Sequence, residues 1–191
     1  MFRRKVADGI EIKLFEPHEA ETIYAVVERN RRRLRQWLPW VDRTRSPEDI
    51  REFISRAVSK YETSGAPDTG IWMGGAFAGS VGCHPVDWNN RNTSIGYWID
   101  EAREGQGIMT RCSAVLLDYL FDDLRLHRVE IRCGTGNNRS CAIPERLGFT
   151  REGVASEAEW VNDRWVDLVV WSMLERDWKK RAPSRPRFAG G

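Results

Sequence analysis

The sequence lacks the long apolar runs, leader segment and paired cysteines that would place it in a membrane or an oxidising compartment. No stretch approaches the roughly 20 consecutive apolar residues of a membrane-spanning helix, and no apolar run follows residues 1–5. Cys83, Cys112, Cys133 and Cys141 show no C-x-x-C spacing. We therefore predict a reducing, cytoplasmic location with no membrane partner, and expect Cys112 and Cys133 to behave as small hydrophobic residues.

An excess of charge of one sign is also missing, because 30 basic and 28 acidic residues leave a formal net charge of +2. This balance gives no electrostatic reason to expect direct binding to nucleic acid. Histidine is scarce: His18, His84 and His127 are scattered and no carboxylate cluster accompanies them. We therefore expect no metal site.

What the chain does have is the length of one domain, 191 residues, in which strand and helix periodicities alternate. Strands are predicted at 10–15, 71–76, 79–84, 93–100, 127–134, 149–160 and 164–175, with hairpin turns at Ala78-Gly79 and Asn162-Asp163. Helices are predicted from Ala20 into a basic stretch, from a Ser46-Pro47-x-Asp49 start, and over 108–124 and 138–147. The fold class is therefore α/β (α+β), a mixed sheet of about seven strands in a domain of residues 1–180, and the Pro/Gly/Arg-rich tail 181–191 is predicted to be disordered.

A glycine loop at residues 100–110 joins a predicted strand to a predicted helix. Gly105 and Gly107 allow the backbone to approach a ligand, and the free N–H groups of the following helical turn suit a pyrophosphate. A tight strand-to-helix turn explains the same pattern. A P-loop is disfavoured because no Lys follows Gly107, and a dinucleotide fingerprint because Thr110 stands where a third glycine is needed.

Further motifs follow this loop in a specific order. They are Ile95-Gly96-Tyr97-Trp98, Gly105-Gln106-Gly107-Ile108-Met109-Thr110, Asn137-x-x-Ser140, Glu145-Arg146-x-Gly148-Phe149, and Glu159-Trp160-Val161-Asn162 followed by Asp167. Over about residues 9–178 the chain resembles the GCN5-related N-acetyltransferases (GNAT), and within them the RimJ/RimL branch of ribosomal-protein N-terminal acetyltransferases. Glu104 departs from the Arg or Gln usual in the superfamily, so the loop would have to bind phosphate through backbone N–H groups.

The resemblance implies that acetyl-CoA is the acyl donor and lies in a V-shaped splay between strands 93–100 and 127–134. The implied cofactor-binding residues are Trp98, Ile99, Asp100, Gly105, Gln106, Gly107, Ile108, Met109, Thr110 and Asn137. The first three would pair with the pantetheine, the loop would hold the pyrophosphate, and Asn137 would bind the pantetheine arm.

For catalysis the resemblance places Glu159 in the acceptor pocket as the base, where burial would raise its pKa, and Ser140 near the sulfur as donor to the leaving thiolate. A solvated hairpin residue is the alternative for Glu159, and a helix cap the alternative for Ser140. Trp37, Trp40, His84 and Trp160 are candidate substrate-binding residues, with His84 also a reserve base; the tryptophans could instead belong to the core or a dimer contact. Cys141 is a weak candidate for an acyl-cysteine.

The acceptor is the part that the sequence leaves open. The resemblance favours a protein N-terminal α-amine, as on a ribosomal protein, acetylated by direct attack in a ternary complex. A small amine such as an antibiotic, a polyamine or a toxin is the alternative, and a non-catalytic acyl-CoA-binding module is a third. The basic stretch Arg29–Arg35 is either a solvated helix face or a wall that recognises an acidic partner. Relatives in this branch also lead us to expect a homodimer.

Overall fold

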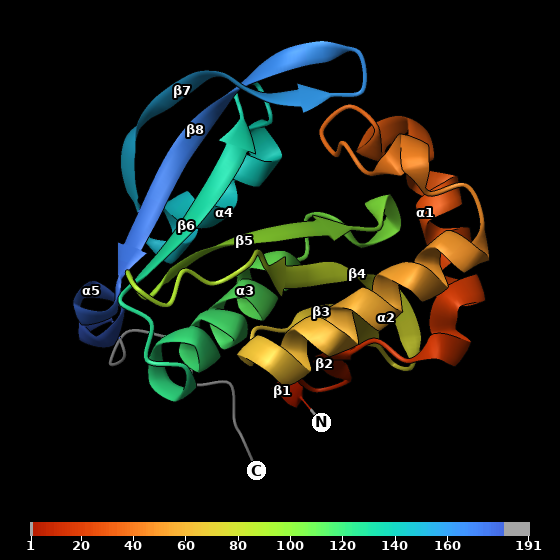
Figure 1. The fold of residues 1–191 in the computed structure, drawn as a ribbon, viewed down its shortest axis with the longest axis horizontal. Coiled ribbons are helices and arrows are strands. Elements are labelled where there is room, and N and C mark those ends of the chain that lie inside the picture. Colours follow the sequence, from red (N-terminus) through yellow and green to blue (C-terminus); the bar gives the residue numbers. More distant parts are fainter. Residues whose placement is uncertain (1, 182–191) are drawn as a thin grey trace.

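Residues 2–181, which the computed structural model describes, form one eight-stranded sheet with helices on both faces (Figure 1). The strands are β1 (Arg3–Ala7), β2 (Ile10–Leu14), β3 (Asp68–Met73), β4 (Ala76–Cys83), β5 (Asn92–Ile99), β6 (Arg128–Gly134), β7 (Thr150–Val161) and β8 (Arg164–Leu174). The helices are α1 (Ala20–Leu34), α2 (Pro47–Ser64), α3 (Ile108–Asp118), α4 (Asn138–Leu147) and α5 (Glu175–Lys180), with short helical turns at η1 (Pro17–Glu19), η2 (Val41–Arg43), η3 (Glu101–Arg103) and η4 (Tyr119–Asp123).

Two apolar cores lie on the two faces of the sheet. Helices α1 and α2 pack on one face, around Phe15, Trp72 and Phe77 with Trp98 at the edge. The larger core covers the other face, where α3 and α4 pack against strands β1 to β6. Because successive residues of a strand point to opposite faces, Tyr97 joins the α3/α4 core and its neighbour Trp98 joins the α1/α2 core.

The sheet opens between its only parallel neighbours, β5 and β6, in the order β1-β2-β3-β4-β5-β6-β8-β7. These strands pair from Asn92 and Arg128 as far as Ile95 and Ile131, although β5 continues to Ile99 and β6 to Gly134. Beyond Ile95 the two strands diverge (Figure 1). This confirms the predicted V-shaped splay, and it leaves one edge of β5 without a strand partner.

Local sequence accounts for the helix starts that surround the splay. Ser46 caps α2 and forms the predicted reciprocal box with Asp49. Gly107, with φ of +68°, is the residue before α3, and Asn137 accepts a hydrogen bond from the Ser140 N–H at the start of α4. Among residues 2–181, no helix is long and apolar enough to cross a membrane.

Several predicted boundaries were wrong. The sheet has eight strands rather than about seven, because β1 was missed, and the first hairpin turns at Gly74-Gly75, whereas Ala78-Gly79 lies inside β4. The helix expected over 108–124 ends at Asp118 and continues as the π-helical turn η4. The predicted disorder of the tail falls, from residue 182 onward, outside the described residues.

Candidate active site

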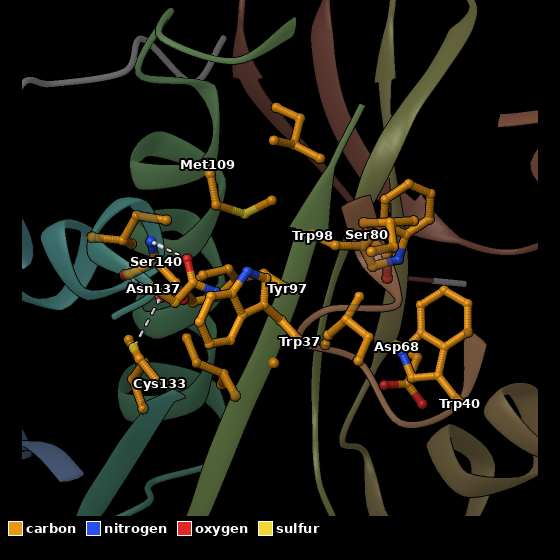
Figure 2. A pocket seen from close by; sticks show the side chains of 18 of the residues that line it. Trp37, Trp40, Asp68, Ser80, Tyr97, Trp98, Met109, Cys133, Asn137 and Ser140 are labelled. Carbon is orange, nitrogen blue, oxygen red and sulfur yellow. Dashed lines mark hydrogen bonds between the residues drawn. The ribbon is translucent and has the colours of Figure 1, made fainter. Parts of the chain in front are cut away.

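A single large cavity occupies the splay and extends to both sides of β5. Its volume is about 2120 Å³, and its lining runs from the glycine loop and α4 to α2 and β7. Figure 2 shows Asn137, Cys133 and Ser140 on one side of the central strand and Asp68, Ser80 and Trp40 on the other. The cavity thus joins the two faces of the sheet where β5 lacks a neighbour.

The glycine loop closes one end of this cavity. Gly105 and Gly107 have φ of +74° and +68°, a left-handed conformation that glycine adopts at no steric cost. The first turn of α3 then presents the backbone N–H groups of Ile108, Met109 and Thr110, which a helix start leaves unpaired. All six residues from Gly105 to Thr110, Gln106 included, line the cavity, so this end can bind a pyrophosphate through its backbone.

Glu104, which stands before the loop, is neutralised by two arginines. Arg33 pairs with its Oε1 at 2.6 Å and Arg139 of α4 pairs with its Oε2. Its carboxylate is only 19% exposed. The acidic departure at this position therefore does not leave a free negative charge at the phosphate-binding end.

Trp98, Ile99 and Asp100 were expected beside the pantetheine. Of these, only Ile99 turns its backbone N–H and C=O groups toward the splay. The Asp100 N–H bonds to the Ala78 carbonyl of β4, so by alternation Trp98 also turns its backbone to β4, whereas Tyr97 and Ile99 turn theirs to the open edge. The Trp98 side chain lines the cavity, but Asp100 does not.

Asp100 serves a structural role instead. Its buried carboxylate accepts hydrogen bonds from Arg29 and from Asn30, the latter at 2.9 Å. Burial opposes the charged form, but these hydrogen bonds outweigh it and lower the pKa of Asp100.

Asn137, Ser140 and Tyr97 meet at the start of α4. Asn137 Oδ1 accepts from the Ser140 N–H at 3.2 Å, so the cap of this helix is Asn137 and the Ser140 hydroxyl is spared from that task. The Tyr97 hydroxyl donates to the Ser140 carbonyl at 3.0 Å and lies 3.5 Å from the Ser140 hydroxyl. Burial raises the pKa of the adjacent Cys133 thiol to about 12, which makes that thiol a poor nucleophile.

Glu159 of β7 reaches the cavity from the opposite wall. Its carboxylate is half-buried, and this burial raises the pKa of Glu159, against a smaller opposing effect of His84. His84 also lines the cavity, with Nδ1 2.9 Å from Ser94 Oγ. Glu159 and His84 thus line the same cavity and interact electrostatically.

Two of the three predicted tryptophans line the cavity and one does not. Trp37 packs on Gly134 at the end of β6, and Trp40 lies 6.1 Å from Trp98 between ring centroids. Trp160 is 50% exposed and packs edge-on against Trp165, outside the cavity. Its position next to Glu159 on a strand directs the two side chains to opposite faces.

Most arginines of the basic stretch of α1 have partners within the domain, whereas Arg32 stays exposed. Arg29 pairs with Asp100, Arg33 with Glu104, and Arg35 with Asp42. Arg31 donates to the Val41 and Thr44 carbonyls. These arginines therefore hold α1 against the glycine loop and against residues 41–44, which follow α1 in the chain.

The β7–β8 hairpin is fastened over the cavity by its tip. The Asn162 side chain donates to the Arg35 carbonyl at 2.5 Å, and Arg164 donates to the Gln36 carbonyl at 3.0 Å. The Arg164 guanidinium also lies over the Trp37 ring, 5.4 Å from its centroid. These contacts bridge the open end of the splay and hold Glu159 in place above it.

Two features of the site escaped the prediction. Tyr97 stood inside a quoted motif, but its contact with Ser140 crosses 43 positions. The partly buried ion pair of Lys60 with Asp68, at 2.5 Å, joins α2 to β3 in the cavity wall, and no sequence signal indicated it. Within residues 2–181, no group of three His, Cys, Asp or Glu side chains is placed to hold a metal ion.

This geometry can support acyl transfer to an amine. It combines an anion-binding helix start, a strand edge with free backbone groups, a hydroxyl at Ser140 and a carboxylate with raised pKa at Glu159.

Comparison with known proteins gives the same class. The sequence model of the "Acetyltransferase (GNAT) domain" family matches residues 10–150. The chain is 37% identical over 180 residues to the "Putative ribosomal N-acetyltransferase YdaF" of Bacillus subtilis (strain 168), covering 94% of this chain and 98% of that one. It is 26% identical to the "Ribosomal-protein-serine acetyltransferase" of Escherichia coli (strain K12), covering 89% and 95%.

Two solved structures extend the comparison. RimL, a ribosomal-protein α-N-acetyltransferase solved in complex with coenzyme A, superposes with a TM-score of 0.87 at 25% identity, covering 91% of this chain and 98% of that chain. MccE, a microcin self-immunity acetyltransferase in complex with acetyl-CoA and AMP, gives 0.83 at 27% identity, covering 89% and 94%. The chain belongs to the GNAT family of N-acetyltransferases, and its similarity to RimL and YdaF is to the branch named for ribosomal-protein acetylation.

Proposed function

We propose that this N-acetyltransferase moves the acetyl group of acetyl-CoA to the α-amine of a protein N-terminus, as on a ribosomal protein. The observation that carries the proposal is the cavity volume of about 2120 Å³. Small-molecule sites occupy about 300–1,000 Å³, so the cavity has room for a cofactor and for several residues of a peptide. Relatives named for ribosomal-protein acetylation support this acceptor.

In this proposal acetyl-CoA occupies the splay. Its pyrophosphate binds the N–H groups after Gly107, and its pantetheine pairs with the backbone groups of Tyr97 and with the N–H of Ile99, whose carbonyl already accepts from Arg33. Asn137 keeps its side-chain N–H₂ for the pantetheine arm, because only its Oδ1 is used in capping α4. Trp37 and Trp40 form the wall next to the acceptor.

Transfer proceeds by direct attack. Glu159 takes a proton from the amine, whose nitrogen attacks the thioester carbon, and the Ser140 hydroxyl donates a hydrogen bond to the departing thiolate. An α-amine, with an ordinary pKa near 8, is easier to deprotonate than a lysine side chain near 10.4. The raised pKa of Glu159 suits it to this task.

A panel of acceptors tests the proposal. Acetyl-CoA consumption, followed as thiol release, is measured with peptides beginning with Ser or Ala, with N-terminally blocked copies of them, and with small amines. We expect turnover of unblocked peptides that falls by at least 100-fold in Glu159→Gln while the Kd for acetyl-CoA stays within twofold. Turnover of small amines alone would refute the peptide acceptor, and unchanged turnover in Glu159→Gln would remove that residue as the base.

A small amine is the second candidate, favoured by one observation. The tryptophan-walled side of the cavity has the aromatic surface that a nucleotide-bearing or other aromatic amine would stack on, and MccE was solved with AMP as well as acetyl-CoA. The same panel includes aminoacyl nucleotide analogues. The expected homodimer stays a prediction, which light scattering measures.

A further inference from the structure

A row of three cross-strand partners forms the floor of the cavity on the α1/α2 side. Asp68 of β3 pairs with Gly82 of β4, and Gly82 pairs with Gly96 of β5. Because adjacent strands lie about 4.8 Å apart, the row is about 10 Å long and ends where the splay begins. The two glycines carry no side chains, so side chains of neighbouring residues can occupy the space above them.

Two titratable side chains use that space. Asp68 places Oδ1 over Gly82, where a Cβ would overlap it, and the His84 ring lies over Gly96, with Cε1 3.4 Å from the position of a Cβ. Since Gly82 and Gly96 are direct partners, the carboxylate and the imidazole lie over neighbouring positions of the floor. Burial raises the pKa of Asp68, and Lys60 and then His84 oppose that rise by favouring the charged carboxylate.

Each side chain is fixed from behind. Lys60 pairs with Asp68 Oδ2 at 2.5 Å and donates to the Cys83 carbonyl. Ser94 Oγ holds His84 Nδ1 at 2.9 Å. In the described part of the chain, Asp68 Oδ1 and His84 Nε2 keep no hydrogen-bond partner, and both residues line the cavity. Their free atoms are thus available to reactants or to each other through water.

Glu159 is a second carboxylate whose pKa responds to this imidazole. It shares the cavity with His84, and the two interact electrostatically. His84 thus interacts electrostatically with two carboxylates, one on β7 and one on β3, and is itself exposed to solvent. His84 is therefore a titratable group that interacts both with the half-buried Glu159 and with solvent.

The reaction needs such a path. A protonated amine loses two protons in becoming an amide N–H, and the CoA thiolate takes up one, so each acetyl transfer releases one proton. If Glu159 receives that proton, the residue must lose it before the next amine arrives.

We propose that His84, with Asp68 beside it, carries this proton from Glu159 to solvent. The relay uses the tautomer in which Nδ1–H donates to Ser94 Oγ, so that Nε2 holds the lone pair. Because no hydrogen bond joins Glu159 to His84, a bridging water carries the proton: the Glu159 O–H bond breaks as the water takes that proton, the water gives one of its own to His84 Nε2, and the imidazolium then gives its proton to water or buffer. Asp68 stabilises the imidazolium, while Lys60 balances the Asp68 charge when the ring is neutral. The relay rests on the proposed role of Glu159 as the base.

Chemical rescue tests the relay. Turnover of His84→Ala, Asp68→Asn and the control His18→Ala, whose side chain is 75% exposed on η1, is measured at low buffer strength with and without imidazole. The acceptor is whichever one the wild-type chain acetylates. We expect kcat of His84→Ala to fall at least tenfold with KM within twofold, and imidazole to restore most of it with saturation. Asp68→Asn should lose severalfold in kcat, and the control should not respond.

Two results would overturn the relay: an unchanged kcat in His84→Ala, or a loss that imidazole does not reverse and that resides in KM. A measurement without turnover adds a second criterion. The NMR shift of the His84 Cε1 proton should change in both Asp68→Asn and Glu159→Gln while that of His18 does not, and constancy in either variant contradicts the arrangement. If peptides are silent and a small amine is acetylated, the proposed acceptor fails, but the same variants measure the relay on that amine.

Discussion

Arg33 of α1 and Glu104 before the glycine loop form an ion pair of 2.6 Å across 71 positions of sequence, and the same guanidinium donates to the Ile99 carbonyl. One side chain thereby neutralises the carboxylate at the phosphate-binding end and fixes the last residue of β5. The loop and the strand edge that are proposed to bind acetyl-CoA depend on it together.

Arg33→Ala should therefore weaken acetyl-CoA binding. It uncovers the Glu104 charge beside the pyrophosphate, and we expect the Kd to rise about tenfold, or about 1.4 kcal/mol. Isothermal titration calorimetry measures this, with the exposed neighbour Arg32→Ala as the matched control. Adding Glu104→Gln to Arg33→Ala should recover part of the loss, because the repelling charge is gone. Equal affinities for both arginine variants would contradict this account.

The rate of acetyl transfer should fall at low pH through the titration of Glu159. A base works as the carboxylate, so activity is present above its pKa and is lost as the pH falls through it. Burial raises this pKa, so the loss sets in at a higher pH than the ordinary value of about 4.3 implies. Profiles of kcat/KM between pH 5 and 9 should show this limb in the wild type and not in Glu159→Gln. A limb that persists in Glu159→Gln belongs to another group.

Substitution of Ser140 and of Asn137 should distinguish a role in catalysis from a role in capping α4. Because Asn137 caps α4, Asn137→Ala should lower the free energy of unfolding by about 1 kcal/mol. Ser140→Ala should leave stability within about 0.5 kcal/mol and lower kcat about 10- to 100-fold, through loss of a donor to the thiolate. Urea unfolding and steady-state kinetics supply the two numbers. A stability loss in Ser140→Ala as large as that in Asn137→Ala would return the serine to a structural role.

Gly82 and Gly153 provide a matched pair of strand glycines. A Cβ at Gly82 would overlap Asp68 Oδ1 and come within 2.9 Å of the Asp68 Cα, whereas nothing lies within 4 Å of a Cβ at Gly153. Gly82→Ala should therefore lower the free energy of unfolding by about 1–3 kcal/mol and displace Asp68. Gly153→Ala should change it by less than about 1 kcal/mol. Thermal or urea unfolding of the two variants decides the matter, and similar losses in both would count against the tight packing at Gly82.

Sequence was a good guide wherever the signal was local. The Ser46-Pro47-x-Asp49 pattern predicted a capping box that the structure confirms, since each group needed lies within four positions. The alternation of β5 and the glycines before α3 likewise located a strand followed by a helix start, while the splay beside them was implied by the family resemblance. By contrast β1 was missed because its burial pattern has one buried residue, Val6, on a charged edge strand, and therefore no alternation.

The rest depended on contacts between distant segments. Glycines at 74, 75 and 79 offered competing turns, and only the pairing of β3 with β4 shows that the chain reverses at Gly74-Gly75. The arginines of α1 read as a solvent-facing run, because their partners Asp100 and Glu104 follow about 70 positions later. The face on which Trp160 lies was set by pairing within the β7–β8 hairpin, which has an irregular register between Ala155 and Glu159.

Because no strand lies beside the end of β5, the site has two parts whose amino-acid sequences can diverge at different rates in evolution. Where a ligand completes hydrogen bonds of the main chain, as proposed for Tyr97 and Ile99, substitution of side chains alters the fit little. Where residues of α2 and of the β7–β8 hairpin line the cavity, the surface consists of side chains, and each substitution alters it directly. A lineage carrying this fold can therefore acquire new acceptors while its donor stays the same, and comparing acceptor ranges among relatives that differ in α2 would trace that history.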